Sequence, residues 1–157
     1  MKKILFIVED LYGGGAEKVL LNTASLLQEN KANVIVYTLR KKIEHNIPEN
    51  IELLNLAIVN RFTKSISNIF LEKIQASLIY QKILKEAPDV IISCSCDKIT
   101  RHLPDNLNIY YWIHGNITGF ANELTPIHPR LEERLGNTVV IVQLYRNLLS
   151  SRSASST

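Results

Sequence analysis

The sequence contains little cysteine, no long apolar run and only a small excess of charge. Cys94 and Cys96 are the only cysteines among 157 residues. They lie two positions apart in a predicted strand, which places both thiols on one face, so a disulfide between them is not expected. That pattern fits a reducing cytoplasm. No segment approaches the roughly 18 apolar residues of a membrane span, and a net charge of +3 is too weak to indicate nucleic acid as a partner.

Apolar residues make up 46% of the chain, which is enough for the core of one domain. Short apolar runs alternate with helical patterns along residues 1–142. This alternation predicts an α/β fold, a Rossmann-like, doubly wound, mostly parallel sheet with helices on both faces. Residues 143–157 are rich in serine and we expect them to form a disordered tail. The predicted strands cover residues 3–8, 33–39, 51–57, 89–95, 109–114 and 138–142.

Two long helices are predicted between these strands, over residues 16–30 and 67–87. Residues 60–66 are basic and are predicted to be irregular, and a short helix is predicted near residues 129–135. Apolar residues of the second long helix recur at steps of three and four, which predicts one buried face. That face comprises Ile69, Phe70, Ile74, Leu78, Ile79, Ile83 and Leu84.

The stretch from Ile4 to Asn22, ILFIVEDLYGGGAEKVLLN, organises the rest of the chain. A buried strand is followed by three glycines, Gly13 to Gly15, and then by a helix. Glycine lets a backbone approach a ligand closely, and the first amides of a helix lack intrahelical acceptors and carry the positive end of the helix dipole. The arrangement predicts a site for an anion such as phosphate.

Other interpretations of this loop fit less well. The dinucleotide-binding fingerprint is incomplete, because Lys18 occupies the position of its third glycine. The strand at residues 33–39 is followed by Arg40, Lys41 and Lys42 instead of an acidic residue that would hold a ribose, which argues against a nicotinamide-dependent dehydrogenase. No Gly-Lys-Ser/Thr sequence completes a P-loop. A turn with a purely structural role remains as the alternative.

The same stretch resembles the start of family 4 glycosyltransferases. The resemblance covers residues 1–142 and implies one half of a GT-B fold, in which two Rossmann-like domains face each other across a cleft. It also implies a nucleoside diphosphate sugar as donor, linked to UDP or GDP, and a glycan or lipid-linked acceptor, with no cofactor and no metal. The matching residues are Gly14-Gly15-Ala16-Glu17, Lys18 to Asn22, and Val34 to Val36.

In the resembled family, a second domain carries most of the donor-binding residues, including a pair of glutamates. No matching pair is found here in a corresponding position. We therefore expect the chain to be a truncated, acceptor-side N-terminal domain, inactive as a glycosyltransferase in isolation. The alternative function is a non-enzymatic nucleotide- or phosphate-binding domain or a regulatory remnant.

Three loops are predicted to converge at the carboxyl ends of the strands, where the strand order reverses. They are the loops that contain Gly13 to Gly15, Ser95 and His114. By resemblance, Gly13, Gly14, Gly15 and Glu17 lie by the donor diphosphate or the acceptor. His114, at the end of the fifth strand, is the candidate catalytic residue, and the resemblance implies that it donates hydrogen bonds to sugar or phosphate oxygens; capping of the strand end is its structural alternative. Residues proposed to line the cleft are Ser95, Asp97 and Asn116.

The sequence also bears on two further ligands, a metal ion and an anionic membrane. Cys94 and Cys96 with His102 and His114 lack the spacing of a zinc site, so no metal is predicted. Lys64, Lys73 and Lys82 recur every nine residues and therefore do not form a single stripe on a helix. Lysines at this spacing leave at most a weak peripheral contact with the inner face of an anionic membrane. Together with the cysteine pattern, they favour a cytoplasmic protein.

Overall fold

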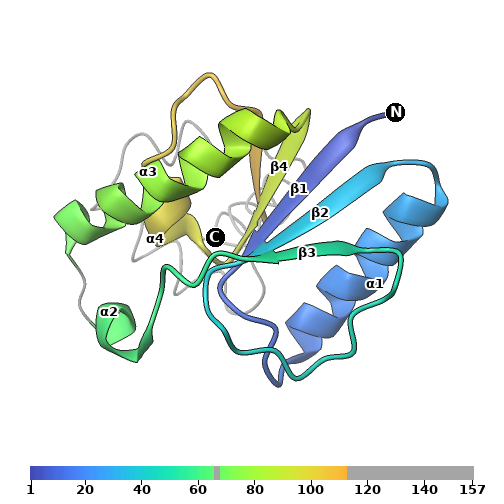
Figure 1. Cartoon of the computed structure of the whole chain (residues 1–157), viewed down its shortest axis with the longest axis horizontal. Coiled ribbons are helices and arrows are strands. Elements are labelled where there is room, and N and C mark those ends of the chain that lie inside the picture. The colour runs from blue at the N-terminus through green and yellow to red at the C-terminus, as the bar shows by residue number, and fades with distance from the viewer. Residues whose placement is uncertain (66–67, 113–157) are drawn as a thin grey trace, which may run out of the picture.

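The computed structural model describes residues 1–65 and 68–112. Its elements alternate between strand and helix along the chain (Figure 1). The strands are β1 (Lys3–Val8), β2 (Asn33–Thr38), β3 (Glu52–Asn55), β4 (Val90–Cys94) and β5 (Ile109–Trp112). The helices are α1 (Gly15–Glu29), α2 (Arg61–Ser65), α3 (Ile69–Glu86) and α4 (Asp97–Thr100).

The strands form one parallel sheet with the order β3-β2-β1-β4-β5. β1 lies at the centre, where Phe6 pairs with Val36 of β2 on one side and with Ile92 of β4 on the other. The strand order therefore reverses between β1 and β4, as a doubly wound sheet requires. The predicted fold class is confirmed, and the predicted sixth strand at residues 138–142 lies outside the described residues.

Helices cover both faces of the sheet (Figure 1). Alternate residues of β1 point in opposite directions, so Leu5 and Ile7 belong to one apolar cluster and Phe6 and Val8 to the other. The first cluster includes Ile79 of α3, and the second includes Leu20 of α1. β1 is thus buried on both faces, which explains its continuous apolar sequence.

The buried face of α3 differs from the predicted one. Ile79 and Ile83 are buried as expected, but Phe70 is 71% exposed and Leu84 is 60% exposed. Ile69, Ile74 and Leu78 are also exposed, and their inward places are taken by Glu72, Gln75 and Ala76. The polar side chains of Glu72 and Gln75 can be buried because both have partners. Gln75 Nε2 donates to the carbonyl of Ile58 at 3.2 Å, and Glu72 forms the ion pairs described below. The prediction of one apolar, buried face was therefore wrong.

Two other local predictions need correction. The stretch predicted to be irregular contains α2, which begins after a reciprocal pair of hydrogen bonds: Asn60 N donates to Thr63 Oγ1, and Thr63 N donates to Asn60 Oδ1, both at 2.8 Å. The thiols of Cys94 and Cys96 do not share a face, because β4 ends at Cys94 and Ser95 has a left-handed backbone with φ of 54°. Cys94 packs in the α1-side cluster and Cys96 in the α3-side cluster, and both are free thiols.

Within the described ranges, no helix combines the length and the apolar character that crossing a bilayer requires.

Candidate functional site

The first hollow at the carboxyl edge of the sheet lies where the strand order reverses. It has a volume of about 180 Å³ and is lined by the ends of β1 and β4 and by the first turn of α1. Its polar lining residues are Glu9 and Asp10 after β1, Ser95 after β4, and Glu17 on α1. Glu17 and Ser95, which were predicted separately from distant parts of the sequence, therefore line the same cavity.

The glycine loop leads into this hollow from the N-terminal side of α1. Gly13 has a φ of 68°, a left-handed conformation that favours glycine, and Gly14 is the extended N-cap of α1 with no side-chain cap. A Cβ added to Gly14 would collide with the carboxylate of Glu17, whereas one added to Gly15 would meet no atom within 4 Å. The Glu17 side chain is therefore folded back over Gly14, beside the helix N-terminus.

This placement gives the helix N-terminus a negative charge from its own chain. Glu17 Oε2 is shielded from solvent and has no hydrogen-bond partner in the described structure. A shielded carboxylate oxygen without a partner is costly, and the positive end of the helix dipole offsets part of that cost. An incoming phosphate would have to displace Glu17, whereas an incoming hydroxyl could donate a hydrogen bond to it.

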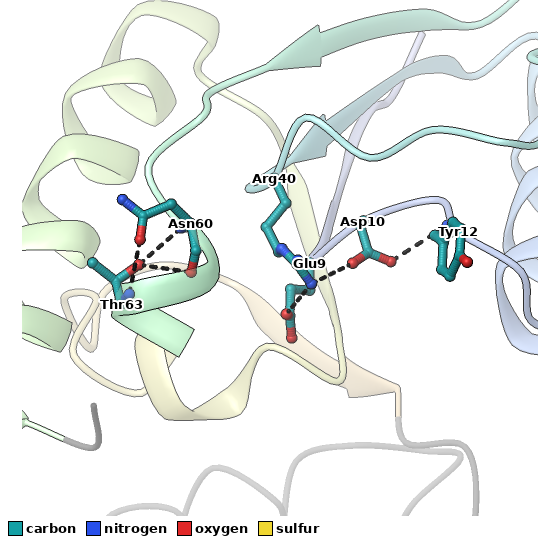
Figure 2. A network of polar contacts seen from close by, with 6 residues as sticks. All are labelled: Glu9, Asp10, Tyr12, Arg40, Asn60 and Thr63. Atoms are coloured by element: carbon teal, nitrogen blue, oxygen red, sulfur yellow. Dashed lines mark hydrogen bonds and ion pairs between the residues drawn. The ribbon is translucent and has the colours of Figure 1, made fainter. Parts of the chain in front are cut away.

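An ion-pair cluster holds the other acidic residues of the first hollow (Figure 2). Arg40 Nη1 lies 3.0 Å from Asp10 Oδ2 and 3.4 Å from Glu9 Oε1. Asp10 Oδ1 also accepts a hydrogen bond from the backbone N–H of Tyr12 at 3.3 Å. One arginine thus bridges two carboxylates just beyond β1 and fixes the start of the loop that carries the glycines.

A second hollow, of about 290 Å³, opens on the α3 side of the same edge. Ser95, Asp97 and Glu9 line it together with Glu72 and Gln75 of α3. Ser95 and Glu9 border both hollows, so the two cavities meet at the ends of β1 and β4. The predicted cleft residues Ser95 and Asp97 are therefore brought together as well.

The buried carboxylate of the second hollow has two basic partners. Glu72 Oε2 lies 2.7 Å from Arg101 Nη2 and 3.0 Å from His102 Nε2. Burial disfavours the ionised form of Glu72, but hydrogen bonds from His102 and Arg101 and their charges outweigh that effect and hold the pKa of Glu72 below its ordinary value. Glu72 is thus a fixed anion that ties α3 to the segment after α4.

Neither thiol at this edge is suited to nucleophilic or metal chemistry. Burial raises the pKa of Cys94 well above its usual range, and burial, followed by nearby acidic groups, raises the pKa of Cys96. Both thiols therefore stay protonated at neutral pH. Among residues 1–65 and 68–112, no group of three or more His, Cys, Asp or Glu side chains is placed to hold a metal ion.

The predicted site is only partly within reach of the structure. His114 and Asn116 lie outside the described residues, so the proposed cleft containing both Gly14 and His114 stays a prediction. Sequence reasoning did not identify Glu9 and Asp10 as cleft residues, although two carboxylates immediately after the central strand of a predicted parallel sheet are a readable signal. Their partner Arg40 was noted only as the residue that replaces a ribose-binding acid.

Comparisons with known proteins support the architecture. No protein family matches the chain by sequence, and no curated protein matches it. Among solved structures, the apo form of the lipopolysaccharide outer core galactosyltransferase WaaB matches 74% of this chain and 34% of its own, with 19% identity and a TM-score of 0.53. Sucrose-phosphate synthase from Thermosynechococcus elongatus matches 86% of this chain and 38% of its own, with 12% identity and a TM-score of 0.55.

The chain thus spans little more than a third of the length of these two structures. At such low sequence identity the likeness concerns the fold. The described residues form a Rossmann-like α/β domain whose fold is similar to that of a part of each of these two structures.

Proposed function

We propose that this chain is the N-terminal, acceptor-side domain of a family 4 glycosyltransferase that transfers a sugar from a UDP- or GDP-linked donor to a glycan or lipid-linked acceptor. The observation that carries the proposal is the first hollow. It is lined by the first turn of α1 and by several hydrogen-bonding side chains, and the glycine loop directly precedes that turn. The hollow lies at the reversal of the strand order, where α/β sheets bind their ligands. The glycosyltransferase-like fold supports the same function.

The residues divide into two chemical groups in this proposal. The backbone amides at Gly13, Gly14 and Gly15 are suited to the diphosphate of the donor, because they are close-approach donors at a helix N-terminus. Glu17, Ser95 and Asp97 are suited to sugar hydroxyls. The carboxylates of Glu17 and Asp97 can accept hydrogen bonds from them, and the Ser95 hydroxyl can accept or donate. His114 and Asn116 are proposed to complete the cleft, with His114 as the candidate catalytic residue.

The charge of the first hollow sets a condition on donor binding. Glu9 and Asp10 are neutralised in part by Arg40, but Glu17 is not paired with any basic side chain that the structure describes. A diphosphate that approaches Gly14 therefore requires the Glu17 side chain to turn away. Once turned, its carboxylate can accept a hydrogen bond from a hydroxyl of donor or acceptor.

The second candidate function is a nucleotide- or phosphate-binding domain without transferase activity. It needs the glycine loop but not the sugar-binding side chains. Saturation-transfer NMR with UDP- and GDP-sugars separates the two functions. Saturation of the sugar protons supports the transferase domain, whereas saturation confined to the nucleotide supports the alternative.

The main test is a titration of the ¹⁵N-labelled chain with UDP and GDP. We expect shifts of the backbone amides from Gly13 to Lys18 and at Ser95. Gly14→Ala forces the Glu17 carboxylate to move and should change these shifts, while Gly15→Ala adds its methyl group in open space and is the matched control. Shifts confined to residues away from the glycine loop and Ser95 would contradict the proposal.

We also propose that the 157 residues alone bind nucleotide without turning over substrate. Glycosyl transfer depends on holding donor and acceptor in line, and the matched glycosyltransferase structures are much longer than this chain. Cytoplasmic location, with peripheral contact to the inner face of an anionic membrane, is part of the same proposal and is tested by cell fractionation.

A further inference from the structure

A third hollow, lined almost entirely by cations on its polar side, lies beyond the ends of β2 and β3. Its volume is about 370 Å³. Arg40, Lys41 and Lys42 line it from the loop after β2, and Arg61 lines it from the start of α2. Ala57 and Val59 form apolar parts of the wall, and no carboxylate is among the lining residues. Neither the glycine loop nor any of the predicted cleft residues belongs to it.

Two of the four cations are available to a ligand. Arg40 is engaged by Glu9 and Asp10, and Lys42 Nζ lies 3.1 Å from the centre of the Tyr12 ring. Lys41 and Arg61 are exposed and form no ion pair with any residue that the structure describes. The excess of positive charge in the hollow is therefore not neutralised by the protein itself.

The backbone on both sides of the hollow is fixed by hydrogen bonds. The Asn55 side chain joins the two loops, because its Nδ2 donates to the carbonyl of Arg40 at 3.1 Å and its Oδ1 accepts from the N–H of Ala57 at 2.9 Å. The Lys42 carbonyl accepts from the N–H of Leu11 at 3.0 Å.

The start of α2 is fixed in the same way. The reciprocal hydrogen bonds between Asn60 and Thr63 hold the backbone just before Arg61 (Figure 2). A fixed backbone loses less freedom on binding than a mobile loop does, so the backbone that carries the cations is preorganised for a ligand.

We propose that this basic hollow binds a phosphate or diphosphate group, and that it is a separate anion site from the glycine loop. Lys41 and Arg61, which form no ion pair with a described carboxylate, favour a multiply charged anion, and the guanidinium group of Arg61 matches the geometry of phosphate oxygens. The phosphate can belong to a soluble phosphoester or to a lipid headgroup at a membrane surface. Phosphate binding at this hollow does not rest on the proposed glycosyltransferase function; only an assignment of that phosphate to the acceptor would rest on it.

The test is a titration of the ¹⁵N-labelled 157-residue chain with inorganic pyrophosphate at low salt. We expect amide shifts at Lys41, Lys42, Ala57 and Arg61. The double variant Lys41→Gln/Arg61→Gln should weaken binding by about fivefold per charge, or about twenty-fivefold for both. Lys82→Gln/Lys85→Gln, which removes two exposed cations from α3, is the matched control and should leave the affinity unchanged.

A second arm distinguishes the two sources of phosphate. Vesicles of phosphatidylcholine with phosphatidylglycerol are sedimented with the wild-type chain and with both double variants. Sedimentation that depends on Lys41 and Arg61 assigns the site to lipid headgroups, and pyrophosphate binding without sedimentation assigns it to soluble phosphoesters.

The proposal is overturned if Lys41→Gln/Arg61→Gln binds both probes as well as the control variant does, or if pyrophosphate shifts only Gly13 to Lys18. The Gly14→Ala variant distinguishes failure of this proposal from failure of the proposed function. It alters the glycine loop and should leave pyrophosphate binding at the basic hollow intact.

Discussion

At the scale of single residues, Glu17 is the side chain whose position changes the interpretation of the site most. The sequence placed it in the first turn of a helix, where a carboxylate interacts favourably with the dipole. The structure adds that its carboxylate lies over Gly14, where a phosphate was predicted to bind. Only the rotamer reveals this competition, because a helical position does not fix where the end of a long side chain lies.

The competition leads to a prediction for Glu17→Gln. Removing the negative charge should tighten binding of UDP or GDP by about fivefold, the effect of one like charge near the phosphate in a solvated site. Isothermal titration calorimetry measures the change. Glu29→Gln, at the other end of α1, is the control and should bind as the wild type does. Unchanged or weaker binding by Glu17→Gln would mean that Glu17 does not oppose the nucleotide.

Other residues show why a sequence predicts positions better than contacts. The absence of a Cys94–Cys96 disulfide was predicted, but the opposite directions of the two thiols were not. That difference comes from the left-handed backbone of Ser95, an unusual conformation for a residue other than glycine. Nothing in the local sequence signals this left-handed conformation. Ser95 adopts it just after the end of β4, where the first and second hollows meet.

At the scale of elements, the order of the main strands and helices could be predicted, whereas the orientation of α3 could not. β1 and β2 are continuous apolar runs, typical of strands buried on both faces. In α3 the apolar residues surround much of the helix, so periodicity alone selects the wrong side. Partners distant in sequence determine which face of α3 is buried, because Arg101 and His102 pair with Glu72. The short helix α2 was missed, although Asn60 and Thr63 have the spacing of a helix start.

The orientation of α3 can be tested by unfolding in urea. Ile79→Ala should lower the free energy of unfolding by about 2–5 kcal/mol, because Ile79 is fully buried in the α3-side cluster. Phe70→Ser should change it by no more than about 0.5 kcal/mol, because Phe70 is 71% exposed. A large loss of stability for Phe70→Ser together with a small one for Ile79→Ala would restore the face predicted from periodicity.

At the scale of the whole molecule, the reversal of strand order between β1 and β4 connects the fold to the candidate site. Because β1 is central and β4 follows α3, residues as distant in sequence as Glu17 and Ser95 meet at one edge. The sequence predicted that meeting through the general rule for parallel sheets. The basic hollow beyond β2 and β3 was not predicted, since it depends on the side-chain bridge made by Asn55 between two loops.

The same sheet should make the two apolar clusters unfold as one unit. β1, β2 and β4 each contribute residues to both clusters, so neither face can open without exposing strands that the other face needs. Leu20→Ala on α1 creates a cavity in one cluster and should cost about 2–5 kcal/mol. Native-state hydrogen exchange should then show equal loss of protection for the most protected amides of β1, β4 and α3.

Leu26→Ala is the control for this last experiment, because Leu26 lies on the same helix and is 58% exposed. It should leave the exchange of the slowest amides nearly unchanged. If Leu20→Ala speeds exchange in α1 and β2 while the slowest amides of α3 keep their wild-type protection, the two faces open independently. In that case the glycine loop on the α1 side and Asp97 on the α3 side are not held by one cooperative framework. A ligand that spans both hollows would then have to bring the two faces together itself.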